Sequence, residues 1–237
     1  IMGNTTPSIE PYTIPDNNDA AIRSLVNDFS DGFLGPQQAH TLMELVGIRM
    51  PGQVLVKTED ELFQVAKILQ YPLVQKIVGP LHKSDQKGVI VDVLNDVELI
   101  HNFKKLIEID GVTGVMIQEM IKGKEVFIGG KRETGFPPLI MCGAGGIYIE
   151  ALKDHQSVLA PISRAEARNM VSKLKIKSIL QGMRGEPSCN LEAFYDAIQK
   201  VSHLLQLVPE ITELDLNPLI LTEQDIIAVD VRIKIEK

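Results

Sequence analysis

Three polar residues alternate with leucines near the C-terminal end, in a run that is otherwise typical of a β-strand. Glu213, Asp215 and Asn217 are separated from one another by Leu214 and Leu216. Because side chains alternate between the two faces of a strand, the three polar groups are expected to share one face. Carboxylate and amide oxygens suit Mg²⁺, which takes one or two such protein ligands together with water and nucleotide phosphates. The run therefore indicates a magnesium-nucleotide site.

A second apolar run, residues 226–232, follows shortly afterwards and contains Asp230. As the returning strand of a hairpin, it would bring Asp230 beside Asp215 and Asn217. Two ordinary amphipathic strands with a solvated polar face explain the same residues equally well.

Two residues in and after an earlier apolar run are candidates for phosphate chemistry. Lys76 lies inside the run, where its charge is costly unless it meets a partner such as a phosphate. An ordinary strand lysine whose ammonium group reaches water is the alternative. His82 follows in a polar loop, where it is a candidate nucleophile for a phosphoryl group, with Asp85 or another carboxylate setting its tautomer. A loop histidine is more often an ordinary surface residue.

Two further segments contain predicted turns whose residues suit nucleotide binding. Glu119 and Glu125 flank a turn between two apolar runs, which suits adenine recognition by the main chain and ribose recognition by an acid. Gly143, Gly145 and Gly146 follow an apolar run and would let backbone amides approach a phosphate or another chain. Their spacing matches neither the Walker nor the dinucleotide-binding motif. A charged hairpin and a plain flexible turn are the alternatives.

Composition narrows the class of protein. The 237 residues carry a net charge of −7 with no dense cluster of Lys and Arg, so no nucleic-acid partner is expected. Cys142 and Cys189 lie far apart without metal-ligand spacing, which predicts reduced thiols and no zinc site. No apolar stretch is long enough to span a membrane, and no signal pattern begins the chain, so we expect a cytoplasmic protein without membrane contact.

Helical and extended patterns alternate along the chain. Capping boxes begin helices at Thr58 and Ser163, and Asn190 caps a long third one. The patterns predict two further helices and six strands before the C-terminal hairpin, at residues 35–47 and 97–107, and at 54–56, 72–78, 89–94, 115–120, 126–128 and 139–142. They indicate an α+β (α/β) fold with mixed sheets flanked by helices. We expect a linker at residues 1–18, an N-terminal lobe at 19–110 and a C-terminal lobe at 111–237.

Five motifs occur in an order that resembles a known family. They are KIVGPLHKSD, VMIQEMIKGKEVFIGGKRE, GAGGIYIEALKD, QGMRGEP, and ELDLNPLI with AVDVRI. From about Phe29 to Ile233 the chain resembles the ATP-grasp subunit or domain of ADP-forming acyl-CoA synthetases (acetate–CoA ligases), relatives of the succinyl-CoA synthetase β subunit. The resemblance implies an ATP-grasp fold whose two lobes bind Mg²⁺ and ATP or ADP. It also implies a CoA-binding ligase subunit or upstream domain as partner, for interconverting acyl-CoA, ADP and phosphate with acid, CoA and ATP.

The same resemblance implies residue roles. Lys76 would contact the ATP phosphates, Glu119 with its neighbouring backbone the adenine, and Glu125 the ribose. Asn217 and Asp230 would hold magnesium.

Two catalytic residues complete the roles that the resemblance implies. His82 would take a phosphoryl group from the phosphohistidine of the partner and present it to ADP. Asp215 matches an acidic position near the histidine-phosphate site. Imidazole is a good reversible phosphoryl carrier, and Mg²⁺ with Lys76 would offset charge during transfer.

Some loops depart from the family pattern. Lys87 stands where a glycine is usual, Ala144 replaces a bulkier residue, and an arginine common near Val158 is missing. These changes favour an alternative function, a non-catalytic ATP-binding regulatory module attached to an acyltransferase or CoA-binding domain. A third possibility, an ATP-grasp ligase of another kind with acyl-phosphate chemistry, would not need His82.

Overall fold

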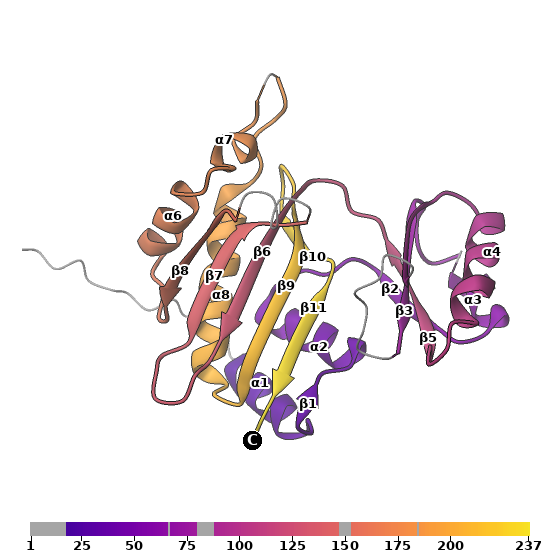
Figure 1. Ribbon diagram of the computed structural model, residues 1–237, viewed down its shortest axis with the longest axis horizontal. Coiled ribbons are helices and arrows are strands. Elements are labelled where there is room, and N and C mark those ends of the chain that lie inside the picture. The colour runs from indigo at the N-terminus through magenta and orange to yellow at the C-terminus, as the bar shows by residue number, and fades with distance from the viewer. Residues whose placement is uncertain (1–17, 66, 80–87, 147–152, 184) are drawn as a thin grey trace, which may run out of the picture. The chain divides into compact units, whose positions relative to one another are not determined.

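Figure 1 shows the computed structural model, which describes residues 18–65, 67–79, 88–146, 153–183 and 185–237. These residues form two compact units. The larger unit joins the described residues up to Met50 with Lys122–Lys237, and the smaller unit is Pro51–Ile121. The units divide the chain at other residues than the expected lobes, 19–110 and 111–237, which stay a prediction.

The larger unit is built on a seven-stranded sheet in the order β1-β11-β9-β6-β7-β8, in which β10 also pairs with β9. The pairings along this order are antiparallel. Its strands are β1 (Gly32–Phe33), β6 (Lys124–Lys131), β7 (Leu139–Ala144), β8 (His155–Leu159), β9 (Ile211–Leu221), β10 (Ile226–Ala228) and β11 (Val231–Ile235).

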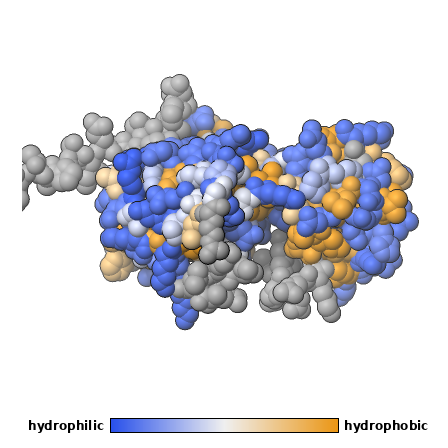
Figure 2. All heavy atoms as spheres, turned by 90° about the horizontal axis from the view of Figure 1, so that it is seen from above, coloured by the Kyte–Doolittle hydropathy of each residue, from blue (hydrophilic) through white to orange (hydrophobic). Residues whose placement is uncertain are grey.

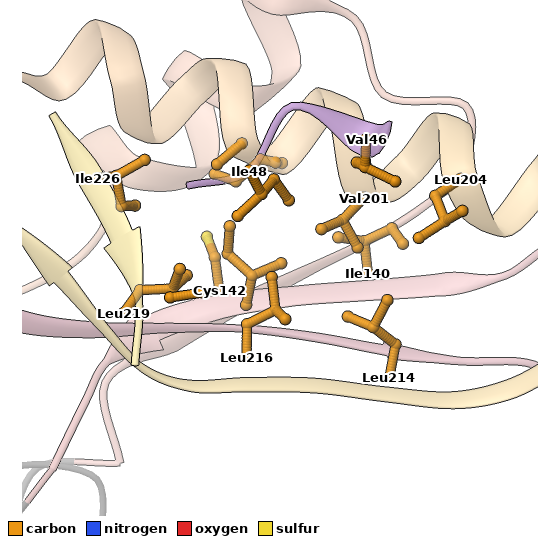
Figure 3. Packing of buried hydrophobic residues seen from close by; sticks show 14 of the residues in the cluster. Val46, Ile48, Ile140, Cys142, Val201, Leu204, Leu214, Leu216, Leu219 and Ile226 are labelled. Carbon is orange, nitrogen blue, oxygen red and sulfur yellow. The ribbon is translucent and has the colours of Figure 1, made fainter. Parts of the chain in front are cut away.

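Helices cover one face of this sheet (Figure 1). They are α1 (Asn18–Asn27), α2 (Pro36–Val46), α6 (Arg164–Ser172), α7 (Lys177–Leu180) and α8 (Leu191–Leu207). The core between helices and strands is apolar, as Figure 3 shows for Val46, Ile48, Ile140, Cys142, Val201, Leu204, Leu214, Leu216, Leu219 and Ile226. We call the opposite face the outer face of the larger sheet.

The predicted caps begin and end the helices as expected. The Ser163 side chain and the Glu166 carboxylate form a reciprocal capping box, and Asn190 Oδ1 accepts from the Ala193 amide at 3.1 Å. Helix α2 ends at Gly47, which has a φ of 75° and so suits glycine. The predicted strand boundaries are also close to those observed. The sequence missed α1, α7 and the strands β1 and β8.

The smaller unit is a four-stranded sheet in the order β2-β5-β3-β4 with two helices. Its elements are β2 (Gln53–Val56), α3 (Glu59–Val65), β3 (Leu73–Val78), β4 (Val89–Val93), α4 (Asp96–Ile107) and β5 (Gly114–Glu119). Leu73, Ile117 and Phe103 belong to a separate apolar core on the helical face. Its other face is the outer face of the smaller sheet.

The predicted C-terminal hairpin needs one correction. Residues 226–232 were expected to form a single returning strand, but they divide into β10 and the start of β11. Both strands pair antiparallel with β9, and Asp230 lies just before β11 begins. The described helices include none that is both long and apolar enough to cross a bilayer.

Candidate nucleotide and magnesium site

Strands β9 and β11 together present a polar row on the outer face of the larger sheet. Leu214 and Leu216 are 1% and 0% exposed and belong to the helix-covered core. Asp215 and Asn217, which alternate with them, therefore point to the outer face. The prediction that these polar residues share one face, with the leucines inward, is confirmed.

Asp230 lies opposite Asn217, as the hairpin predicts. Val231 pairs with Leu216 and Arg232 with Asp215. The residue just before β11, Asp230, therefore faces Asn217. The Asn217 amide donates to the Asp230 carbonyl at 3.2 Å. Directly opposed residues of an antiparallel pair share a face, which places Asp230 on the outer face near Asp215 and Asn217.

The electrostatics of Asp215 agree with this clustering of acids. Burial raises the pKa of the Asp215 carboxyl, and the charges of Asp230 and Glu213 raise it further. Arg232, its pairing partner on β11, acts in the opposite direction. The outer face around Asp215 is therefore a place where added positive charge is favourable.

The donor set suits a magnesium ion shared with phosphates better than a cage made of protein alone. In the described part of the chain, no three His, Cys, Asp or Glu side chains lie close enough to hold a metal ion together. Mg²⁺ keeps several waters and commonly binds through one or two protein oxygens plus substrate phosphates. Asn217 and Asp230 fit that pattern as two neighbouring oxygen ligands, and the assignment of the metal to them stays a prediction.

Glu125 lies near the start of β6, beside the glycine segment. Its side chain is exposed, and its carbonyl accepts from the Gly145 amide at 2.9 Å. A Cβ on Gly145 would press on the Val126 backbone, and one on Gly146, whose φ is 57°, would overlap Glu125 Oε2. Glycines are required here because the turn passes directly over the Glu125 side chain.

Gly143 also has a packing reason for lacking a side chain. It pairs with Phe127 on β6 and His155 on β8, and a Cβ would collide with the Phe127 ring and the Asp154 carbonyl. The phosphate-binding role expected for Gly143, Gly145 and Gly146 stays a prediction. The Gly145 amide already serves the fold through its bond to Glu125.

Lys76 is on β3, between β5 and β4, where it pairs with Met116 and Val89. Its neighbour Gln75 is fully buried, and the Gln75 side-chain amide donates to the Leu99 carbonyl of α4 at 3.1 Å. Alternation therefore directs the half-buried Lys76 to the outer face of the smaller sheet. The contact with phosphates expected of Lys76 stays a prediction.

Glu119 ends β5 and turns its carboxylate toward the chain before β3. Glu119 Oε1 accepts from the Gln70 amide at 3.2 Å, and the Glu119 amide donates to the Gly52 carbonyl at 2.9 Å. The side chain thus fastens a loop of its own unit. The expected adenine contact stays a prediction. His82 and Lys87 lie outside the described residues.

Two outer-face residues were not among the predicted site residues. The sequence motifs assign no role to Arg232 or to Phe33. The Arg232 guanidinium carbon lies 4.2 Å from the centroid of the Phe33 ring. The alternation of Asp230, Arg232 and Lys234 along β11 was a usable sign of Arg232. Nothing local marked Phe33, because β1 is distant in sequence.

Comparisons with known proteins agree on the family to which this fold belongs. Residues 26–235 match the ATP-grasp domain. The chain is 38% identical over 205 residues to the beta subunit of acetate–CoA ligase (ADP-forming) I of Pyrococcus furiosus, covering 82% of this chain and 88% of that one. It is 40% identical over 198 residues to 4-hydroxybutyrate–CoA ligase (ADP-forming) of Nitrosopumilus maritimus, covering 79% of this chain but only 28% of that longer protein.

A solved structure shares the fold over nearly the whole chain. It is the dinucleotide forming acetyl-coenzyme A synthetase 1 of Ca. Korarchaeum cryptofilum, in complex with coenzyme A and Ca-AMPCP. The TM-score is 0.81 at 30% identity, covering 92% of this chain and 99% of that one. Another structure of that protein contains Mg-AMPPCP and a phosphohistidine segment pointing towards the nucleotide binding site, with a TM-score of 0.77 at 28% identity.

The chain therefore belongs to the ATP-grasp family, among the relatives of the beta subunits of ADP-forming acetate–CoA ligases. The α+β fold class and the resemblance inferred from the motifs are confirmed.

Proposed function

We propose that this chain is the nucleotide-binding part of an ADP-forming acyl-CoA synthetase, a ligase that works with a CoA-binding subunit or domain. It would convert acyl-CoA, ADP and phosphate to acid, CoA and ATP. The observation that carries the proposal is the pairing of Asn217 with Asp230 beside Asp215 on one sheet face. Mg-AMPPCP in a structurally similar protein supports Mg²⁺ and ATP or ADP as ligands.

The residue roles that the family resemblance implies are part of this proposal. Asn217 and Asp230 would hold Mg²⁺, Lys76 would contact the phosphates, Glu125 the ribose, and Glu119 with its neighbouring backbone the adenine. When bound, Mg²⁺ neutralises charge that develops during phosphoryl transfer. The buried free thiols Cys142 and Cys189 are compatible with the reducing cytoplasm, where we place the protein.

His82 is the proposed phosphoryl carrier. In the direction of ATP synthesis its imidazole nitrogen takes the phosphoryl group from the phosphohistidine of the partner, and the β-phosphate oxygen of ADP then displaces the imidazole. A phosphohistidine segment in the structurally similar synthetase supports this step. Asp215 is assigned to the acidic position near the histidine-phosphate site, where a carboxylate would favour the charged form of an imidazole.

The relay is tested by incubating the chain with Mg²⁺ and ATP labelled at the γ-phosphate. We expect acid-labile, base-stable label that disappears in His82→Ala and persists in His101→Ala, a matched change of an exposed histidine on α4. Label that remains in His82→Ala would contradict the relay. Nucleotide binding without any label, alone or with the CoA-binding partner added, would favour the non-catalytic regulatory module.

A further inference from the structure

Arg232 differs from the other cations near Asp215 on the outer face of the larger sheet. Lys234 lies 2.5 Å from Glu236, and Lys131 lies 3.2 Å from Glu133. Each of these ammonium groups already has a carboxylate partner. Within the described part of the chain, no carboxylate lies within ion-pair distance of Arg232, although it is surrounded by acids.

An aromatic ring holds Arg232 in its place. Strand β1 pairs Phe33 with Lys234, the position two residues beyond Arg232 on β11. The Arg232 guanidinium carbon lies 4.2 Å from the Phe33 ring centroid, within the range of a cation–π contact. Stacking on a ring fixes the plane of a guanidinium while leaving its N–H donors available to a planar or tetrahedral anion.

Asp215 lies beside a residue without a side chain on the neighbouring strand. Asp215 pairs with Arg232 on one side and with Gly129 of β6 on the other. A Cβ built on Gly129 would meet no atom closer than Met141 Cε at 3.4 Å. Gly129 therefore adds no side chain next to Asp215, and β9 separates it from Arg232 on β11.

The position of Arg232 relative to Asn217 and Asp230 indicates which phosphate of the nucleotide it would contact. Arg232 is two residues from Asp230 along the same strand, which corresponds to a separation of about 6.6 Å. Phosphates that share the magnesium ion lie within a few ångströms of it. The Arg232 guanidinium, two residues further along the chain than Asp230, is therefore placed to contact a terminal phosphoryl group that extends beyond the metal. Three acids lie around this position, so an arriving phosphate needs a compensating cation.

We propose that Arg232 binds the terminal phosphoryl group of the nucleotide beside Asp215, and that Phe33 is the positioning residue that orients its guanidinium. The inference rests on the proposed function, since it assumes a nucleotide at Asn217 and Asp230. It assigns a direct phosphate contact to Arg232 and an indirect effect to Phe33. ADP lacks the group that Arg232 would bind, so Arg232 is expected to distinguish ATP from ADP.

The test compares the affinities of the full chain for Mg-ATP and Mg-ADP by calorimetry. Arg232→Gln should weaken Mg-ATP about tenfold and Mg-ADP less than twofold, because it removes a charge-assisted contact made only by the terminal phosphate. Phe33→Leu should weaken Mg-ATP about threefold, with recovery in Phe33→Tyr, which keeps the ring. Lys234→Gln is the matched control, because it removes a positive charge from the same strand and face and should change neither affinity.

Each other outcome has a definite meaning. Arg232→Gln that weakens both nucleotides equally, or neither, would overturn the inference while leaving the proposed function intact. A wild-type chain that binds neither nucleotide with Mg²⁺ would overturn both. Melting curves identify a variant that does not fold, and Arg232→Lys, which keeps the charge, should then retain most of the preference for ATP if the inference holds.

Discussion

The two units share one plan, a sheet with helices on one face, but their outer faces differ in chemistry. The larger sheet carries acids and amides in register, with Asp215, Asn217 and Asp230 close together. The smaller sheet places Lys76 among apolar side chains: the exposed fractions of Leu55, Val89 and Val91 are 39%, 46% and 55%. Figure 2 shows hydrophobic side chains gathering on the surface of this unit. An acidic face suits a metal ion, whereas a lysine in apolar surroundings suits an anion that also has a flat apolar part, such as a nucleotide.

This difference indicates that a side chain that binds a metal ion and a side chain that binds phosphate require different kinds of neighbour. A carboxylate that binds a metal must remain charged, and other acids nearby are tolerable because the ion compensates them. A lysine that binds phosphate gains from apolar neighbours, which exclude water and strengthen its interaction with an anion. Substitutions on the two faces should therefore weaken nucleotide binding in different ways.

The largest effect is expected on the acidic face. Asp230→Asn should weaken Mg-ATP binding by roughly 100-fold, since the ion loses a charged ligand, but should change the affinity for ATP in excess chelator little. Calorimetry with and without Mg²⁺ measures both. The matched control is Glu223→Gln, an exposed acid in the turn between β9 and β10. Equal Mg-ATP affinity in wild type and Asp230→Asn would mean that the metal ion does not bind at this face.

A smaller effect, without metal specificity, is expected from the smaller sheet. Lys76→Met should weaken ATP by roughly tenfold both with and without Mg²⁺, because the lysine interacts with the phosphate charge itself. The methionine keeps the apolar stem of the side chain, and melting curves check that the variant folds. Lys67→Met, at an exposed position after α3, is the control. A loss seen only with Mg²⁺ would mean that Lys76 acts through the metal ion and not on the phosphate charge directly.

Local chemistry explains which parts of this comparison could be predicted from the sequence. The strict alternation of Glu213, Asp215 and Asn217 with leucines determines their face, and capping residues such as Ser163 mark where helices begin. The position of Asp230 needed only one assumption, that the next run returns beside β9. These features depend on neighbours within a few residues or on one hairpin.

The missed features depend on contacts between distant segments. The two-residue strand β1 has no periodicity to detect, and its place beside β11 brings Phe33 to Arg232 across about two hundred residues of sequence. The packing role of the glycines at 143, 145 and 146 likewise appears only when β6, β7 and the chain near Asp154 are assembled. Glycine spacing alone cannot distinguish a phosphate-binding turn from a turn that packs closely on a side chain.

The larger unit also differs from the smaller one because it joins two separate stretches of chain. The smallest expected effect concerns the link between these stretches. Helix α1 is fastened to the segment between α8 and β9 by Arg23, which donates to the two Glu210 carboxylate oxygens at 2.6 and 2.9 Å. Hydrogen bonds from Arg23 lower the pKa of Glu210. The smaller unit is one continuous stretch and needs no comparable link.

Glu210→Gln should lower the free energy of unfolding by about 0.5–1 kcal/mol at pH 7, a modest value because solvent screens this partly exposed pair. Since the pKa of Glu210 is lower in the folded state, its contribution is complete above the unfolded value of 4.5 and is lost as the pH falls through the folded value. Denaturant titrations should therefore separate wild type from Glu210→Gln at pH 7 and bring them together in strong acid. Glu44→Gln, which alters an exposed pair with His40, should show no difference at pH 7. A gap between wild type and Glu210→Gln that widened in acid would mean that Arg23 does not hold the charged form of Glu210.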